Sequence, residues 1–450
     1  MKKITTYRHK KVLVLGLARS GVKAAELLHE LGAFVTINDK KAFAENPAAQ
    51  DLLEEGIKVI TGSHPIELLD EGFELVVKNP GIPYENQMVQ KALELNIPVI
   101  TEVELAYQIS EAQIVGITGT NGKTTTTTLI NEILNAGDKT AHLAGNIGFP
   151  AAGVAMEAKK DDVITMELSS FQLMGIQTFR PHIAVIVNIY EAHLDYHGSR
   201  QGYVAAKLRI FENQQADDYL VVNWNQPELR ELITQAKSRI VPFSTKEVVE
   251  AGAYVLDGNL MFKDEIVGQQ QDIILPGEHN LENVLAAICV AKLEGQSNET
   301  IMHVLSTFYG VEHRTQFIKT LNNRRFYNDS KATNIISTES ALKGFKEPVV
   351  LLAGGLDRGT EFDELKPFFK NVRAVVLFGE TKHKIARVAT EAGVEHIKIV
   401  TDVEEAVPVA YEYSEPGDVI LLSPACASWD QVPSFEVRGD LFIKAVQELV

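Results

Sequence analysis

The chain has 450 residues, which is too long for one hydrophobic core and predicts about three domains. Its 43 basic and 60 acidic residues give a net charge of -17, which argues against a nucleic acid or an anionic membrane as partner. Two cysteines, Cys289 and Cys426, are too few for a disulfide framework or a four-cysteine zinc site and favour a reducing cytoplasm. The sequence contains no apolar stretch long enough to span a membrane, and residues 1–17 lack a signal-cleavage pattern.

The first region, residues 1–102, predicts a Rossmann-like βαβ unit. Its signals in chain order are an apolar run at 12–15, a GLARSG turn at 16–21, a helical pattern to residue 28, an apolar run at 34–37 ending before Asp39, and a strand at 75–77 before a KNPG loop. Ala18 replaces the middle glycine of the dinucleotide fingerprint, so the turn leaves open both a dinucleotide site and a unit without one. Because open α/β sheets bind ligands beyond their strand ends, we expect ligands at these loops.

The second region, residues 103–310, begins with a phosphate-binding loop. Residues 115–125 read VGITGTNGKTT, between an apolar strand and a threonine-rich helix. Gly119 and Gly122 let backbone N–H groups face an anion, while Lys123 and Thr124 can reach the phosphates and Mg²⁺. A strict P-loop would have its first glycine at position 117, so an ordinary glycine-rich turn is the alternative. The pattern predicts that the chain handles ATP or GTP.

Two groups that follow the loop could hold a metal ion. Glu167 ends an apolar run at 163–166, where a carboxylate can hold Mg²⁺ opposite Thr124, and a solvated acid at a strand end is the alternative. Further along, His193, Asp195 and His197 alternate as in a strand that runs into a loop. The alternation leaves open a zinc site, a solvated polar loop, or a histidine at the magnesium or phosphate site.

A further candidate residue of this region is a lysine in a helical stretch. Lys207 lies within residues 203–211, and its neighbours alone predict a surface lysine whose stem packs on apolar atoms. A strand at 183–187 and a helix at 280–293 complete the second region.

The third region, residues 311–450, repeats the α/β rhythm. The expected parallel strands lie at 349–353, 374–378 and 419–422. Arg314 is either a phosphate-facing arginine or a linker charge. The NDSKATN segment at 328–334 is rich in hydrogen-bonding side chains directly after an apolar pair, which favours a binding loop over a bland one.

These motifs together resemble the Mur ligase family, the ATP-dependent amide ligases of cytoplasmic peptidoglycan-precursor synthesis, and the resemblance runs nearly end to end. The TGTNGKT loop at 118–124 is that family's form of the P-loop, shared with folylpolyglutamate synthetases. The turn at 16–21, the segment at 328–334, LSPACAS at 422–428 and FEVRGD at 435–440 resemble the members that add D-glutamate to UDP-N-acetylmuramoyl-L-alanine.

The resemblance implies an α/β fold with three domains. These are a Rossmann-like N-terminal domain at 1–102 that binds the UDP substrate, a central P-loop-type ATPase domain at 103–310, and a C-terminal Rossmann-like α/β domain at 311–450 that binds the amino acid. A cytoplasmic monomer that serves cell-wall growth, cell shape and division is expected, with small molecules rather than nucleic acid or membrane as partners.

The resemblance also implies roles for individual residues. The expected catalytic residues are Lys123, Glu167, His193 and Lys207. The expected ligands of two Mg²⁺ ions are Thr124, Glu167, His193 and Lys207 as a carbamate, which reverses the surface interpretation of that lysine. ATP is expected at Gly119, Thr120, Asn121, Gly122, Lys123, Thr124, Thr125, Asn280, Asn283, Arg314 and Asp329. The UDP substrate is expected at Asp39, Asn79, Gly81, Asn146, Ser169 and Gln172. D-glutamate is expected at Lys331, Thr333, Arg358, Ser423 and the backbone around Phe435, with Arg358 in place of a lysine that some relatives carry.

The implied reaction converts a carboxylate to an acyl phosphate, which the amine of D-glutamate then attacks, and domain closure excludes water. Related alternatives are ligases that add L-alanine to UDP-muramic acid or glutamate to folate. A nucleotide-controlled switch lacks support because the NKxD base-reading motif is absent. An NAD-dependent dehydrogenase is weakened by Ala18 and by the second nucleotide loop.

Overall fold

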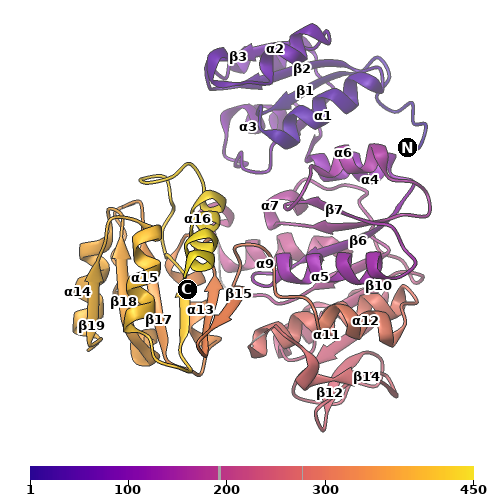
Figure 1. Cartoon of the computed structure of the whole chain (residues 1–450). Coiled ribbons are helices and arrows are strands. Elements are labelled where there is room, and N and C mark those ends of the chain that lie inside the picture. The colour runs from indigo at the N-terminus through magenta and orange to yellow at the C-terminus, as the bar shows by residue number, and fades with distance from the viewer. Residues whose placement is uncertain (191–193, 276, 450) are drawn as a thin grey trace. The chain divides into compact units, whose positions relative to one another are not determined.

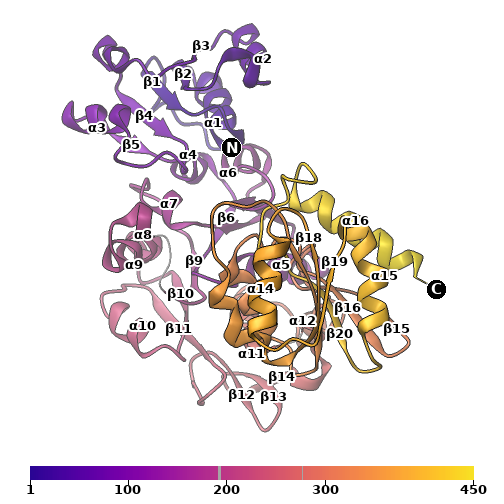
Figure 2. The ribbon, with the colours of Figure 1, turned by 90° about the vertical axis from the view of Figure 1, so that its left-hand side faces the viewer.

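A computed structural model describes residues 1–190, 194–275 and 277–449 of the chain. Its strands form three sheets of five, nine and six strands, each covered by helices, which confirms the expected three-domain α/β class (Figures 1 and 2). The chain divides into two compact units, Met1–Asp272 with Glu282–Ser306 and Ile273–Leu281 with Thr307–Val450. Among the described residues, no helix combines the length and apolar character needed to cross a bilayer.

The first sheet is parallel, with strand order β3-β2-β1-β4-β5. Its strands are β1 (Lys11–Leu15), β2 (Phe34–Asp39), β3 (Lys58–Thr61), β4 (Leu75–Lys78) and β5 (Val99–Ile100). Its helices are α1 (Arg19–Glu30), η1 (Phe43–Glu45), α2 (Ala49–Glu54), η2 (Ile66–Glu71) and α3 (Gln87–Glu94). Alternate residues of β1 face opposite sides, so Val12 and Val14 join the core that includes α1 while Leu13 and Leu15 join the core that includes α3. Gly21 is required because a Cβ there would overlap the Gly16 carbonyl oxygen.

The second sheet has strand order β14-β13-β12-β11-β10-β9-β6-β8-β7, in which the pairs β12–β13 and β13–β14 are antiparallel and the other described pairs are parallel. Its strands are β6 (Gln113–Thr118), β7 (Ala141–Gly145), β8 (Val163–Glu167), β9 (Ile183–Ile186), β10 (Tyr219–Asn223), β11 (Arg239–Ser244), β12 (Ala253–Leu256), β13 (Asn259–Phe262) and β14 (Glu265–Gln269). Its helices are α4 (Glu102–Ile109), α5 (Lys123–Ala136), α6 (Ala151–Glu157), α7 (Ser170–Leu173), α8 (Leu194–His197), α9 (Arg200–Leu208), η3 (Arg209–Phe211), α10 (Pro227–Leu232), η4 (Gln270–Asp272), α11 (Glu278–Leu293) and α12 (Asn298–Leu305). The expectation of a strand running into a loop near 193–197 is wrong for residues 194–197, which form the short helix α8. Residues spaced by two cannot share a face there, because a helical residue turns by about 100°.

The third sheet has strand order β15-β16-β20-β17-β18-β19, and only the pair β15–β16 is antiparallel. Its strands are β15 (Gln316–Leu321), β16 (Arg324–Asn328), β17 (Val349–Gly354), β18 (Val372–Phe378), β19 (His396–Ile399) and β20 (Val419–Leu422). Its helices are α13 (Ile335–Lys343), η5 (Asp363–Asn371), α14 (Lys382–Glu391), α15 (Val403–Tyr413) and α16 (Phe435–Glu448). The three predicted parallel strands are confirmed as β17, β18 and β20. Leu351 faces the core with α13 and α14, and its neighbour Leu352 faces the core with α15 and α16.

Two buried carboxylates hold α4 in place within the first unit. Glu104 of α4 accepts hydrogen bonds from the backbone N–H groups of Gln177, Thr178 and Phe179. Glu102 of α4 accepts from the N–H of Ala152, and burial raises its pKa to about 7. These acids therefore hold α4 by accepting otherwise unpaired N–H groups.

Glu102→Gln should raise the melting temperature clearly more at pH 8 than at pH 5. The folded pKa of about 7 lies above the ordinary value of 4.5, so the folded protein keeps a proton that the unfolded chain loses, and stability falls as pH rises through this window. Glutamine keeps the acceptor oxygen without the charge. Thermal unfolding at both pH values tests this, with the exposed Glu94→Gln as control; an equal shift at both pH values contradicts it.

Candidate functional site

The phosphate loop joins β6 to the first turn of α5. Gly119 and Gly122 have φ of 158° and 76°, which favour glycine. At Gly122 a Cβ would also overlap the side-chain amide of Asn283 on α11. The loop therefore presents the N-terminus of α5, with its backbone N–H groups and partial positive charge, to an anion.

Asn188, the second residue after β9, fixes the shape of this loop. Its carbonyl oxygen accepts the N–H of Thr120 at 2.9 Å, and its side chain exchanges two hydrogen bonds with the backbone of Asn121, at 2.9 and 3.1 Å. In the sequence, Asn188 directly follows the expected strand at 183–187, and no role was predicted for it. The available signal was an amide side chain at the carboxyl end of a strand next to the one that carries the loop.

Lys123 lies against its own loop. Its ammonium donates to the carbonyl oxygens of Gly119 at 2.9 Å and Thr120 at 2.8 Å. Thr124 is buried in the first turn of α5, and Thr125 follows it on the same helix. Lys123 is thus held beside the anion position by two contacts that a phosphate can replace.

The interpretation of Lys207 as a surface lysine is wrong. Its side chain on α9 is 2% exposed, and its Nζ donates to the Gly119 carbonyl oxygen at 2.7 Å. Burial holds the pKa of Lys207 well below its ordinary value, Lys123 lowers it further, and Glu167 opposes the shift. The structure therefore places a readily deprotonated amine directly behind the phosphate loop.

Tyr203 contacts both Lys207 and the phosphate loop, and the sequence did not predict this role. Its ring centroid lies 4.7 Å from the Lys207 ammonium, and its hydroxyl pairs with the Thr120 hydroxyl at 3.0 Å. Tyr203 stands four residues before Lys207 on α9, so the i, i+4 spacing of the two side chains was the signal in the sequence.

Glu167, at the end of β8, has an unpaired buried oxygen. The residue is 1% exposed, its Oε1 accepts from the Asn146 side-chain amide at 2.7 Å, and its Oε2 has no hydrogen-bond partner among the described residues. An unpaired buried carboxylate oxygen is costly unless a cation meets it. This donor set, with Thr124 at the loop, therefore fits Mg²⁺, which prefers carboxylate and hydroxyl oxygens.

His193 lies outside the described residues, as does the side chain of Asp195, so the role expected for His193 stays a prediction. His197 pairs with the Ser170 hydroxyl at 2.9 Å and stacks on Phe171. Within the described ranges no group of three His, Cys, Asp or Glu side chains is placed to hold a metal ion.

Three of the residues expected at the UDP substrate surround the turn at 16–21 of the first sheet. Asp39 accepts the backbone N–H of Leu17 at 2.8 Å. Asn79 donates to the Ser20 hydroxyl at 3.1 Å and accepts the N–H of Gly81 at 3.1 Å. The carboxyl ends of β2 and β4, which flank β1, therefore bring Asp39, Asn79 and Gly81 to one turn.

Ser169 and Gln172 are engaged with each other. They form the capping box of α7, in which the Gln172 side-chain oxygen accepts the N–H of Ser169 at 2.9 Å. The Gln172 carbonyl oxygen also accepts the Thr101 hydroxyl at 2.7 Å. Asn146, expected beside them, contacts Glu167 instead.

In the second unit, Asp329 follows β16 and is buried. It accepts the Ser423 hydroxyl at 2.8 Å and the N–H of Thr315 at 3.0 Å, and burial raises its pKa to about 7 while Arg314 opposes the shift. Arg314 has a buried Nε without a hydrogen-bond partner in the described part of the chain. Ser423 is fully buried and also contacts the hydroxyl of Thr338 at 3.0 Å, so its hydroxyl is engaged by two side chains.

Two further expected residues of the second unit, Thr333 and Arg358, line a pocket. The pocket has about 240 Å³ and is lined by Thr333, Arg358 and Cys426 among others. The Arg358 guanidinium stacks on Trp429, with 5.0 Å between its Cζ and the ring centroid. Nearby in sequence, Lys331 lies 5.2 Å from the ring of Phe435, which begins α16. The pocket therefore combines a cation with apolar walls.

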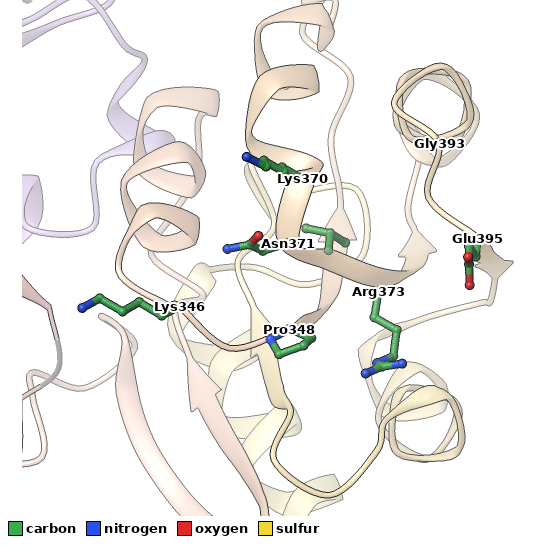
Figure 3. A pocket seen from close by; sticks show the side chains of 8 residues that line it. Lys346, Pro348, Lys370, Asn371, Arg373, Gly393 and Glu395 are labelled. Carbon is green, nitrogen blue, oxygen red and sulfur yellow. The ribbon is translucent and has the colours of Figure 1, made fainter.

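A second pocket, of about 370 Å³, lies at the other end of the same sheet (Figure 3). Lys346, Lys370 and Arg373 line it, but the lysines are exposed and Arg373 is paired with Asp418 and Glu415. It lies before β17 and β18 begin, away from the carboxyl ends where the other candidate residues gather.

The residues expected at ATP and the metal ions thus fall into two groups. In the first unit, Lys123, Glu167, Lys207 and Asn283 lie around the phosphate loop. In the second unit, Asp329 contacts Ser423 and lies within electrostatic reach of Arg314. Asn280 and Asn283 are both buried on α11, where the chain passes from the second unit to the first.

Comparison with known families matches most of the chain. Residues 10–101 match "Mur ligase MurD-like, N-terminal domain", residues 117–291 match "Mur ligase middle domain", and residues 313–426 match "Mur ligase, glutamate ligase domain".

Individual relatives are similar over their full length. A Listeria innocua protein named "UDP-N-acetylmuramoylalanine--D-glutamate ligase" is 67% identical, covering 100% of this chain and 99% of its own. An Enterococcus faecalis protein of the same name is 63% identical with the same coverage. The solved MurF ligase of Thermotoga maritima in complex with ADP is 15% identical with a TM-score of 0.58, covering 99% of this chain and 97% of its own. The solved UDP-N-acetylmuramate-alanine ligase MurC of that organism is 19% identical with a TM-score of 0.57, covering 98 and 99%, and both structures show a shared fold.

Proposed function

The chain belongs to the Mur ligase family, and we propose that it joins D-glutamate to UDP-N-acetylmuramoyl-L-alanine at the expense of ATP, forming ADP and phosphate. The observation that carries the substrate pair is the full-length identity of 67 and 63% to two relatives that have this name. The reaction serves peptidoglycan-precursor synthesis. We propose that the enzyme works as a cytoplasmic monomer.

The phosphate loop is the proposed site of the ATP triphosphate. Lys123 exchanges its two carbonyl contacts for phosphate oxygens, and the N–H groups of the loop and of α5 surround them. Asn283 packs on Gly122, where it fixes the loop beside the nucleotide. Thr120, Asn121, Thr125, Asn280, Arg314 and Asp329 complete the proposed ATP site.

Thr124, Glu167, His193 and carbamylated Lys207 are the proposed ligands of two Mg²⁺ ions. The support is the unpaired Glu167 oxygen and the buried amine of Lys207. Bound Mg²⁺ would offset the negative charge of the triphosphate and of the substrate carboxylate. Deprotonated Lys207 can attack CO₂, so that an N–C bond forms, one proton leaves and a carbamate anion results. Its lowered pKa favours this step because only the neutral amine is a nucleophile.

The chemistry begins at the carboxylate of the UDP substrate. Its oxygen attacks the γ-phosphorus, the bond from that phosphorus to ADP breaks, and an acyl phosphate forms. Lys123 and Arg314 are the proposed cations that reduce the repulsion between these anions. The amine of D-glutamate then attacks the acyl carbon, loses a proton, and phosphate leaves to give the amide.

The second unit is the proposed carrier of D-glutamate, at Lys331, Thr333, Arg358, Ser423 and the backbone around Phe435. Arg358 in the 240 Å³ pocket offers a planar, charged partner for a carboxylate. Trp429 is 65% exposed yet stacks on the guanidinium, so we propose that it holds Arg358 in place.

Trp429→Ala should raise KM for D-glutamate about threefold, because an exposed cation–π contact is worth about that factor, and should leave KM for ATP unchanged. Steady-state kinetics with each substrate varied in turn measures the effect. Equal changes in both constants would instead indicate a general disturbance of the unit. Tyr309→Ala, at another exposed aromatic residue of this unit, is the control.

We propose that residues 1–102, 103–310 and 311–450 are the domains that bind the UDP substrate, ATP and the amino acid, respectively. The phosphate loop belongs to one compact unit, whereas Arg314, Asp329 and the proposed D-glutamate residues belong to the other. Catalysis therefore requires the two units to approach each other and exclude water. Small-angle scattering with ATP and the UDP substrate should report a smaller radius of gyration. An unchanged radius contradicts closure.

Phosphate release tests the proposed function directly. The protein with ATP, Mg²⁺ and UDP-N-acetylmuramoyl-L-alanine is given D-glutamate, L-glutamate or L-alanine, and folate with glutamate is tried in a separate reaction. Only D-glutamate should sustain turnover. Sustained turnover with the folate pair, or none with D-glutamate, would refute the proposal.

A further inference from the structure

Lys78 is a buried cation whose hydrogen bonds, within the described part of the chain, go to uncharged oxygens. It ends β4 and is 0% exposed. Its Nζ donates to the carbonyl oxygen of Ile82 at 2.8 Å, to that of Pro80 at 3.5 Å, and to the Tyr196 hydroxyl at 3.3 Å. The three N–H groups of the ammonium thus meet three acceptor oxygens, and two of these oxygens belong to the loop that follows β4.

Tyr196 and Tyr84 extend this cluster to the second sheet. Tyr196 of α8 directs its hydroxyl at the same carbonyl oxygens, at 3.3 Å from Pro80 and 3.1 Å from Ile82. The ring centroid of Tyr84 lies 4.7 Å from the Lys78 ammonium, and its hydroxyl donates to the Met174 carbonyl oxygen at 3.1 Å. Lys78 is therefore the centre of a contact between the loop at 79–82 and the segment that contains α7 and α8.

The same loop carries residues expected at the UDP substrate. The N–H of Ile82 donates to the carbonyl oxygen of Asn79 at 3.0 Å, which closes the loop into a turn. The Asn79 side chain joins Gly81 to Ser20 of the neighbouring turn. Any movement of the Pro80 and Ile82 carbonyl groups would therefore change the backbone at Asn79 and Gly81.

Folding alone does not call for a charge at this position. A buried ammonium without a carboxylate in contact destabilises a fold, and an apolar side chain of similar length could fill the same volume. Burial accordingly lowers the pKa of Lys78 to about 8, and Glu85 opposes the shift. A function of the loop explains why a cation stands here.

We propose that Lys78 is a positioning residue for the UDP substrate, whose ammonium, together with the Tyr196 hydroxyl, holds the loop at 79–82 in the shape that receives the sugar diphosphate. The inference rests on the proposed function. It adds a residue that does not touch the substrate and acts through the carbonyl groups of Pro80 and Ile82.

Lys78→Met should weaken binding of UDP-N-acetylmuramoyl-L-alanine about tenfold, as expected for loss of charge-assisted hydrogen bonds. The constants KM for ATP and D-glutamate and kcat should stay within about twofold. The melting temperature should stay equal or rise, because a buried cation is removed. Equilibrium binding by calorimetry, steady-state kinetics and thermal unfolding measure these quantities. Lys58→Met, at an exposed lysine of β3, is the matched control.

Tyr196→Phe removes one hydroxyl and keeps the ring that packs on Phe171, with 4.3 Å between ring centroids. It should weaken binding of the UDP substrate about threefold, and the double variant should lose less than the product of the two single effects, because both side chains hold the same carbonyl groups. This variant tests the cluster even if Lys78→Met folds poorly.

The pH dependence gives an independent readout. Wild-type affinity for the UDP substrate should fall as pH rises through about 8, because Lys78 loses its charge, and Lys78→Met should lack this step. The other groups that face the cluster are Tyr84 and Tyr196, whose pKa values burial raises, and Glu85 and Arg209. For Tyr196 the pKa is about 12, so it keeps its proton throughout this range.

Two outcomes overturn the role of Lys78. One is unchanged affinity in both single variants while the wild type binds the UDP substrate. The other is a lowered melting temperature with an equal rise of all three KM values, which indicates a purely structural role. A wild type that binds no UDP-N-acetylmuramoyl-L-alanine refutes the proposed function and this inference with it.

Discussion

Lys123→Ala should lower kcat for D-glutamate-dependent phosphate release by about a thousandfold, the size expected when a preorganised group that stabilises developing charge is lost. The physical reason is the position of the ammonium. It lies within 2.9 Å of two carbonyl oxygens of the phosphate loop, so it adds a positive charge where the γ-phosphate is expected. The measurement is steady-state phosphate release with all substrates saturating.

The fold should survive this substitution, because Lys123 is a donor to its own loop and not part of a core. Circular dichroism and thermal unfolding test that point. Lys160→Ala, at an exposed lysine before β8, should keep wild-type turnover. Turnover of Lys123→Ala at the wild-type rate would remove the phosphate-loop assignment.

Lys207→Ala should lower kcat for ligation by a factor similar to that of Lys123→Ala. A short carboxylate such as acetate, added in trans, should restore part of the activity. The carbamate would provide an anion beside Glu167 in a site from which water is largely excluded, since Lys207 is 2% exposed. The alanine variant leaves room for a small anion there. Lys237→Ala, at an exposed lysine of the same region, is the control.

Lys207→Arg separates the carbamate from a simple positive charge. Arginine keeps the charge but cannot capture CO₂, because its guanidinium does not deprotonate. Nuclear magnetic resonance with ¹³C-bicarbonate should give a carbamate signal in the wild type that this variant lacks. Full activity of either variant would end the carbamate proposal.

A feature of this site could be predicted where the neighbouring residues in the sequence are enough to specify it. The run of residues before Gly119 and the GKT sequence after it specify a strand, a glycine turn and a helix N-terminus, because these depend on periodicity and on φ at single positions. The parallel strands of the third sheet were predictable for the same reason, since their apolar runs are short and continuous. The burial of Lys207 was not predictable, because Ala205, Ala206 and Leu208 do not show which face of α9 is covered.

The sequence by itself determined the three α/β regions, the phosphate loop and the resemblance to a ligase family. Only the tertiary structure decided the partners of each reactive group. Glu167 meets Asn146 across 21 positions, Lys207 meets Gly119 across 88, and Asp329 meets Ser423 across 94. Burial, unpaired oxygens and pKa shifts arise from such distant contacts, because they depend on which atoms exclude water from a group and not on its neighbours along the chain.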